Sequence, residues 1–413
     1  MSQTPPPALD RSDERVHHDD TIAGAFRAFI DRIKAGDLGM LPVVVGLIVI
    51  TVVFTSLNPV FLAPRNLTDL LFDCARVGLI SLGIVCVLLL GEIDLSVGSV
   101  SGVASAIIGV VWVNMGFPVF VAIIAALLMG AIVGLIYSVL FNKLGMPSFI
   151  ASLSGLLTLL GFQLYILGPT GSINLPYASP LVKFGQIYVM PHWMSYALAL
   201  VPGILILLNG VSTAKRRVEA GLTARPMSMT ILKTVTITAG LVFAVWYLNR
   251  GRGVPYMFGL FVLLVVILQY ALTRTKWGRS MFAVGGNREA ARRAGINVKA
   301  IYTSAFVLCS TLAAMGGILS AARLASSSQQ AGTGDVNLNA IAAAVIGGTS
   351  LFGGRGSAYS ALLGIIVIQA ISNGLTLLNL SSSLRYMITG AVLAIAVIVD
   401  SLARQSRATH GRA

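Results

Sequence analysis

Two acidic residues in a hydrophobic stretch are the first candidates for chemistry. Glu92 and Asp94 stand in the segment GEIDLSVGS, directly after an apolar run that ends at Leu90. A charge inside a bilayer costs about 2.5–3.5 kcal/mol on insertion scales, so acids at such positions are candidates for lining a transport pathway. Asp94 has a structural alternative, because its side-chain oxygen can cap the first turn of the following helix. The two roles do not exclude each other.

Other groups that could catalyse a reaction are sparse. The only histidines, His17, His18, His192 and His410, stand in the tails or at the edge of an expected span, so no constellation for nucleophilic catalysis emerges. The three cysteines lie in apolar runs without metal-ligand spacing. The sequence contains no phosphate-binding G-x-x-x-x-G-K-[ST] motif. We therefore expect a chain with no catalytic residue, no metal and no cofactor, and ATP hydrolysis, if used, in another subunit.

The composition indicates that these groups are positioned by membrane-spanning helices. Of 413 residues, 56% are hydrophobic and 11% are charged, which excludes an ordinary soluble domain. The net charge is +14, and we expect the basic residues that cause it to lie in cytoplasmic loops rather than on a nucleic-acid-binding surface. We predict an all-α, polytopic transmembrane helix bundle surrounded by membrane lipid, with no nucleic-acid partner and no disulfides.

Charge placement predicts about twelve spans, with ten as the alternative. Basic residues cluster in the loops at 215–233 and 274–299 and at the C-terminal end, so both termini are expected in the cytoplasm and the number of crossings must be even. A short, glycine-rich segment, Leu338–Gly354, is therefore expected to cross. The alternative of ten spans applies if this segment only dips into the membrane and one other run is not a span. The eleven longer apolar runs are 41–57, 67–90, 95–114, 118–141, 148–168, 190–209, 233–249, 256–273, 300–322, 357–379 and 384–402.

We expect three parts along the chain. Residues 1–40 form a cytoplasmic N-terminal tail, 41–404 the transmembrane domain and 405–413 a cytoplasmic C-terminal tail. Within the first tail, apolar residues recur at helical spacing and predict an amphipathic helix on the inner membrane face, or alternatively a solubilised lead-in to the first span. These apolar residues are Ile22, Phe26, Phe29, Ile30 and Ile33.

Two polar, glycine-rich breaks interrupt the apolar runs at related places. Gly91–Gly102 follows one run and Gly347–Gly364 follows another, and each break precedes a new span. Breaks at matching places in two halves of a membrane protein point toward a transport pathway. Close packing of small residues between helices is the alternative explanation for the glycines taken singly.

The segment GGNREAARRAGINVK, residues 285–299, predicts a short capped cytoplasmic helix. Asn287 can cap its start, Glu289 lies in its first turn, Arg292 and Arg293 lie in its last, and Gly295 can end it in a left-handed conformation. One face is formed by Ala290, Ala291 and Ala294, which would let a partner's groove approach closely. The alternative is a basic loop that only enforces topology.

Four stretches resemble the bacterial ABC importer permeases that serve ribose, xylose and related monosaccharides. They are FLAPRNLTDLL (Phe61–Leu71), GEIDLSVGS (Gly91–Ser99), FAVGGNREAARRAGINVKAIY (Phe282–Tyr302) and LNAIAAAVIGGTSLFGGRGS (Leu338–Ser357), in the order of that family. The extra region that includes YLNRGRGVP (Tyr247–Pro255) is similar to the xylose-type members. The chain departs from the family pattern at Arg293, where members often carry a small or uncharged residue.

The resemblance implies a division of labour. An ABC ATPase subunit powers transport, a periplasmic sugar-binding protein delivers the sugar, and two permease copies form the pathway in the bacterial inner membrane. It implies a role in ATPase coupling for Gly286, Asn287, Glu289, Ala290, Ala291, Arg292 and Gly295. Our expected pathway residues are Glu92, Asp94, Ser96, Gly98, Ser99, Asn339 and Thr349. An ion-coupled sugar carrier and, less favoured, a membrane-embedded enzyme are the alternatives.

Overall fold

The computed structural model describes residues 41–222, 227–391, 394 and 398. These residues divide into two compact units: residues 190–254, which we call the hairpin unit, and residues 41–189 with 255–391, which we call the main unit. The amphipathic helix predicted at 22–33 and the predicted C-terminal tail lie outside the described residues.

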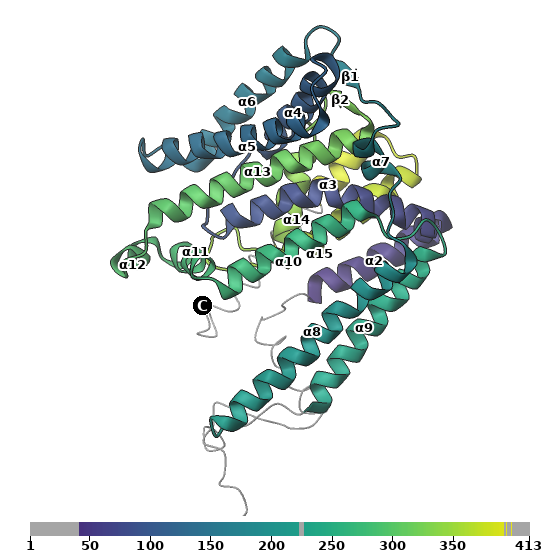
Figure 1. Cartoon of the computed structure of the whole chain (residues 1–413), viewed down its shortest axis with the longest axis vertical. Coiled ribbons are helices and arrows are strands. Elements are labelled where there is room, and N and C mark those ends of the chain that lie inside the picture. The colour runs from purple at the N-terminus through teal and green to yellow at the C-terminus, as the bar shows by residue number, and fades with distance from the viewer. Residues whose placement is uncertain (1–40, 223–226, 392–393, 395–397, 399–413) are drawn as a thin grey trace, which may run out of the picture. The chain divides into compact units, whose positions relative to one another are not determined.

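Helices make up almost all of the main unit (Figure 1). Residues 382–391 are also helical. The labelled elements, in chain order, are α2 (Leu41–Leu57), η1 (Pro59–Leu62), α3 (Pro64–Leu88), α4 (Val97–Ile107), the π-helical turn η2 (Ile108–Asn114), α5 (Val119–Asn142), α6 (Ser148–Leu167), β1 (Ser172–Asn174), α7 (Pro180–Gln186), α10 (Tyr256–Arg274), α11 (Lys276–Gly286), α12 (Arg288–Arg293), α13 (Val298–Leu324), β2 (Ser326–Ser328), α14 (Val336–Ile346) and α15 (Ala358–Leu377).

The polytopic helical fold is confirmed. Within the described residues, nine helices are long and apolar enough to cross a membrane, with α4 and η2 together forming one of them. The predicted runs from 41–57 to 357–379 all fall on helices, and residues 384–391 of the last run, 384–402, are helical as well. The total of twelve spans stays a prediction.

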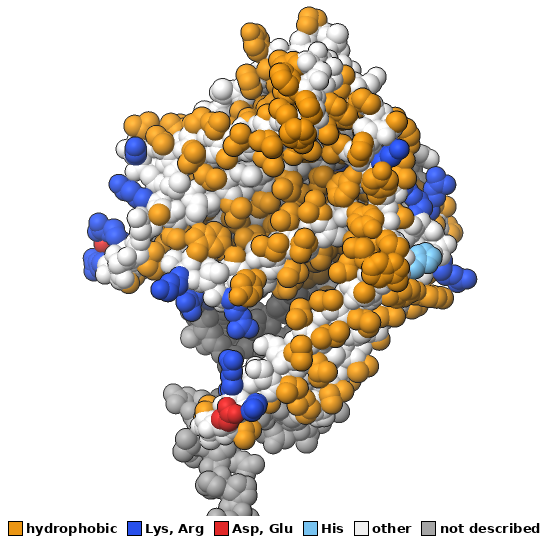
Figure 2. All heavy atoms as spheres, in the orientation of Figure 1, with side chains coloured by type: hydrophobic (Ala, Val, Ile, Leu, Met, Phe, Trp, Pro, Cys, Tyr) orange, Lys and Arg blue, Asp and Glu red, His pale blue; other side chains and the backbone are white. Residues whose placement is uncertain are grey.

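Small residues hold the helices around α13, while large apolar side chains face outward. On α5, Gly130 and Gly134 lie so close to α13 that an added Cβ would meet the carbonyl oxygens of Ser310 and Phe306. The opposite face of α5 exposes Phe120, Ile124, Leu128 and Ile132. This inside-small, outside-large pattern is typical of helices solvated by lipid. In Figure 2 hydrophobic side chains cover the flank of the helices, and Lys and Arg gather near helix ends, including around α12.

Helix α3 defines two ends of the main unit. Its 25 residues extend about 37 Å at 1.5 Å per residue. At its first turn, Asn66 exchanges side-chain hydrogen bonds of 2.8 and 3.0 Å with Asn373 of α15. Just past its last turn, the carbonyl oxygen of Leu89 accepts a 2.9 Å hydrogen bond from the amide of Gly354. We call these the Asn66 end and the Leu89 end.

The segment Leu338–Gly354 extends to the Leu89 end. Helix α14 has 11 residues and is about 16 Å long, which is shorter than the roughly 30 Å hydrocarbon core. A glycine-rich loop follows it and is joined to α3 by the hydrogen bond between Gly354 and Leu89. The segment is therefore a half-length helix followed by a loop.

A cluster of ionised side chains joins α3 to α13. Asp73 pairs with Arg76 at 3.1 Å, as their spacing of three residues indicates. Arg323 of α13 adds ion pairs of 3.3 Å to both Asp69 and Asp73, and its guanidinium lies 5.0 Å from the centre of the Phe72 ring. Arg323 was not recognised from the sequence, because its partners stand about 250 positions away.

Replacing Arg323 with alanine is expected to destabilise the protein by about 1–3 kcal/mol, because it leaves two acids of the cluster without their shared cation. The loss is moderate because Asp69 and Asp73 are 34% and 30% exposed, so water partly screens their charges. The measurement is the thermal unfolding midpoint in detergent. Arg279→Ala, at an exposed arginine of α11, is the control. Equal midpoints for the two variants would contradict the structural role of the cluster.

The hairpin unit consists of two helices, α8 (His192–Glu219) and α9 (Met227–Asn249). Gly203 and Gly210 of α8 face Thr238 and Thr230 of α9, so small residues form the seam between the helices. Helix α9 buries none of its residues. In the main unit, the chain ends on either side of this insertion are adjacent: Val189 and Pro255 form a β-bridge, and the amide of Tyr256 donates to the carbonyl of Tyr188 at 3.2 Å.

Candidate functional site

The short helix α12 has the predicted caps. The side chain of Asn287 accepts a 2.9 Å hydrogen bond from the amide of Ala290, which satisfies one of the free donors of the first turn. The helix ends after Arg293, and Gly295 adopts the left-handed conformation with φ of 82°. The helix therefore starts and stops where the sequence indicates.

Glu289 is held by both arginines of its own helix. Arg292 contacts the carboxylate at 2.8 Å and Arg293 at 3.3 Å. The hydrogen bond from Arg292 lowers the pKa of the exposed Glu289 carboxyl. Arg293, where the chain departs from the family pattern, therefore has a partner within its own helix.

The predicted alanine face is wrong at one position. Ala291 is 3% exposed because it packs within its own chain, whereas Ala290 and Ala294 are exposed. A short helix that packs on its own chain turns at least one residue toward its support, and in α12 that residue is Ala291. The surface free for a partner thus contains Ala290, Ala294 and the Glu289 ion pairs.

Arg288 connects α12 to the neighbouring helices. Its guanidinium lies 5.4 Å from the ring centre of Phe141 on α5 and 5.2 Å from that of Tyr302 on α13, within cation–π range. Nearby, the carboxylate of Glu92 accepts a 2.5 Å hydrogen bond from the hydroxyl of Ser148. Arg288, Tyr302 and Ser148 were not recognised as site residues from the sequence.

Three glycine-rich segments meet at the Leu89 end, and we call this contact the glycine junction: Leu89, Gly91, Gly285, Gly353 and Gly354. A Cβ on Gly285 would overlap the carbonyl oxygen of Leu89, and one on Gly353 would overlap the carbonyl oxygen of Gly285. Gly91, Gly353 and Gly354 have φ of 76°, 81° and 71°, which favours glycine. The junction thus brings both predicted breaks into backbone contact with the loop that carries α12.

The first break forms a tight turn before α4. Asp94 is fully buried and accepts hydrogen bonds from the amide and the hydroxyl of Ser96 at 2.8 and 2.7 Å. The predicted capping of the first helical turn is wrong, because both bonds go to the residue just before the helix. A carboxylate two positions from a serine reaches that amide more easily than the turn beyond it.

The N-terminus of α4 meets the N-terminus of α14. The amide of Gly98 donates to the side-chain oxygen of Asn337, and a Cβ on Gly98 would overlap the carbonyl oxygen of Gly332. Such discontinuous helices are typical of substrate pathways in transporters. The sequence indicated the two breaks but not that the helices starting from them would meet.

The remaining expected pathway residues are buried but do not form one cluster. Ser99 lies in the first turn of α4, Asn339 lies in α14 and Thr349 lies beyond α14, near Leu89 and Gly356. The Oδ1 atom of Asn339 and the hydroxyl of Thr349 are buried without a hydrogen-bond partner. Unsatisfied polar atoms of this kind are costly unless a ligand or water completes them.

Comparison with known proteins decides the family. The model of the family described as branched-chain amino acid transport system / permease component matches residues 66–397. The chain belongs to this family. It is a multi-pass membrane transport permease, and the four motifs and the glycine junction all lie within or at the edge of the matched region.

Individual relatives of this permease cover nearly its whole length. The xylose transport system permease protein XylH of Escherichia coli K12 is 32% identical over 90% of this chain and 94% of its own length. XylH of Haemophilus influenzae is 31% identical over 90% and 98%. The ribose import permease protein RbsC of E. coli K12 is 29% identical over 86% and 92%. No solved structure matches the chain.

Proposed function

We propose that this permease is the membrane-spanning subunit of an ATP-driven importer for a monosaccharide, with D-xylose as the first candidate. It works in the bacterial inner membrane, receives its sugar from a periplasmic binding protein and is coupled to a separate ATPase through residues 285–299. The sugar-permease relatives and the four motifs support this assignment.

The glycine junction is the observation that carries the proposal. A force applied to α12 by an ATPase reaches Gly285 within a few residues, and from there the contact passes to Leu89, Gly91 and Gly353 without any intervening side chain. Backbone-to-backbone contact leaves no flexible group to absorb the displacement. Movement of the docking loop therefore displaces both breaks together, which is what alternating access requires.

The proposed importer contains two copies of this chain. Each chain contributes one docking helix, so an ATPase with two nucleotide sites is matched by a symmetric pair of permeases. The deep part of the pathway carries few charges, in agreement with a neutral substrate whose hydroxyls meet groups such as Asn339 and Thr349.

The test is a reconstituted complex of this permease, its ATPase and its binding protein in liposomes. We expect D-xylose or D-ribose to raise the ATP hydrolysis rate and to accumulate inside, because binding-protein docking and hydrolysis drive the same conformational cycle. The control contains an ATPase variant that binds but does not hydrolyse ATP. Sugar accumulation that follows a proton or sodium gradient without ATP would support the ion-coupled carrier instead. Leucine accumulation without sugar accumulation would overturn the substrate class.

A further inference from the structure

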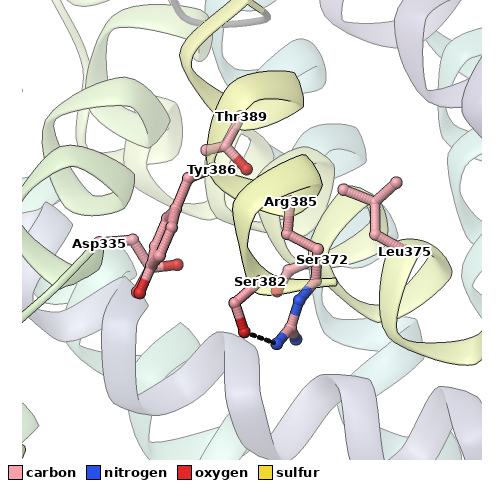
Figure 3. A pocket seen from close by; sticks show the side chains of 7 residues that line it. All are labelled: Asp335, Ser372, Leu375, Ser382, Arg385, Tyr386 and Thr389. Atoms are coloured by element: carbon pink, nitrogen blue, oxygen red, sulfur yellow. Dashed lines mark hydrogen bonds between the residues drawn. The ribbon is translucent and has the colours of Figure 1, made fainter. Parts of the chain in front are cut away.

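A polar cavity lies apart from the docking loop and outside the expected pathway residues. It encloses about 140 Å³ within the main unit, between the segment before α14, the end of α15 and the helical residues 382–391 (Figure 3). One apolar side chain, Leu375, contributes to its wall. The polar side chains that line it are Asp335, Ser372, Ser382, Arg385, Tyr386 and Thr389.

The cavity lies toward the Asn66 end, away from α12. Ser372 immediately precedes Asn373, whose side chain is bonded to Asn66 at the start of α3. The glycine junction lies at the other end of the same helix, about 37 Å away at 1.5 Å per residue. If α12 faces the ATPase in the cytoplasm, the cavity is on the side from which a binding protein delivers.

Its size fits a small sugar. One water molecule needs roughly 10–15 Å³ of cavity volume. The cavity volume of about 140 Å³ is therefore enough for about ten atoms of the size of a water oxygen, and a pentose has about ten non-hydrogen atoms.

The charges favour a neutral ligand with hydroxyl groups. Asp335 and Arg385 line the same space with opposite signs, so a ligand of either net charge would leave one of them unmatched. Asp335 uses one carboxylate oxygen to accept a 2.9 Å bond from Asn339, and a carboxylate has capacity for about four bonds in total. It can therefore accept further bonds from ligand hydroxyls.

Arg385 is held by its own part of the chain and still has donors for a ligand. Its Nη1 and Nη2 atoms already donate to the hydroxyls of Thr376 and Ser382 at 3.2 and 3.1 Å. Its Nε is buried without a hydrogen-bond partner. The Nε–H group is therefore available to donate to a ligand oxygen such as a sugar hydroxyl.

We infer that this cavity is the receiving subsite of the permease, where the hydroxyls of a monosaccharide leaving the binding protein bind Asp335, Arg385 and Tyr386. The inference rests on the proposed function and adds a position and residues to it. Asp335 directly precedes α14, whose far end leads to the glycine junction. A sugar bound here therefore contacts Asp335, which is joined to the second break through α14.

A cysteine-protection experiment tests the subsite directly. Thr389→Cys introduces a thiol in the cavity, while the three native cysteines are buried and react slowly. In the assembled complex, we expect a membrane-impermeant thiol reagent applied from the periplasmic side to label this position, and saturating D-xylose to slow labelling at least about fivefold, as expected when bound sugar covers the site. Tyr165→Cys, on exposed α6 and outside the cavity, is the control and should not be protected.

Uptake measurements separate this inference from the proposed function. Asp335→Asn and Tyr386→Phe are expected to raise the half-saturating sugar concentration for uptake by about tenfold, because each removes one hydrogen bond to the sugar. ATP hydrolysis without sugar and the yield of folded complex are expected to stay at the wild-type level in both variants. Tyr165→Phe, outside the cavity, is the control and should leave uptake unchanged as well.

Four outcomes would overturn the inference or its premise. A wild-type complex that imports no sugar contradicts the proposed function itself. Import that is unaffected by the Asp335 and Tyr386 variants, or labelling that sugar does not slow, contradicts the subsite alone. Protection by leucine and not by D-xylose assigns the cavity to a zwitterion and overturns the sugar inference.

Discussion

Replacing Gly285 with alanine is expected to lower coupled sugar uptake at least about tenfold, because the new Cβ would overlap the carbonyl oxygen of Leu89. That oxygen already accepts the amide of Gly354, so it cannot move aside without breaking the contact between the two breaks. The variant therefore separates the docking loop from both breaks. The measurement is ATP-dependent uptake by the reconstituted complex, alongside its rate of ATP hydrolysis.

Gly161→Ala is the matched control for this substitution. Gly161 lies inside α6 with no atom within 4 Å of an added Cβ, so alanine there is tolerated and removes some flexibility from the helix. We expect Gly161→Ala to transport like the wild type. Normal uptake by Gly285→Ala, with the protein folded and assembled, would show that the glycine junction does not transmit movement.

Replacing Glu289 with lysine is expected to uncouple ATP hydrolysis from uptake, with uptake falling by about fivefold or more. The substitution removes both ion pairs of the helix and places a third cation beside Arg292 and Arg293, near a helix N-terminus that favours negative charge. A six-residue helix is too short to be stable by its own backbone hydrogen bonds, so losing these ion pairs distorts the docking surface while the membrane-spanning helices stay folded.

The comparison for Glu289→Lys is Glu219→Lys, which reverses an exposed acid paired at 3.9 Å with Lys215 on α8. It changes the net charge equally but lies in the hairpin unit, far along the chain from the docking loop. Both uptake and sugar-stimulated ATP hydrolysis are measured for each variant. If Glu289→Lys keeps ATP hydrolysis coupled to sugar uptake, α12 is not part of the docking site.

The elements were largely predictable from the sequence because apolar runs and capping residues are local signals. Asn287 and Gly295 sit at the ends of α12 as their types indicate. The two breaks were visible as glycine-rich interruptions, since Gly91 and Gly353 follow apolar runs. In each case the physical cause lies within a few residues of its effect.

Contacts between distant segments were not predictable in the same way. The close contact between Gly285 and Leu89 joins residues almost two hundred positions apart. No pattern along the sequence indicates which glycine packs against which carbonyl. Arg323 pairs with acids on α3, and Arg385 and Asp335 line the same cavity, for equally non-local reasons. Ala291 was misjudged because burial on a short helix depends on what supports it.

The position at which the hairpin unit is inserted bears on how permeases of different length could evolve. Because Val189 and Pro255 are already paired, cutting out residues 190–254 would leave two ends that a short peptide could rejoin without disturbing the main unit. The second helix of the α8–α9 pair buries none of its residues. Such a pair can be gained or lost in a single genetic event, so permeases of different length can share one main unit.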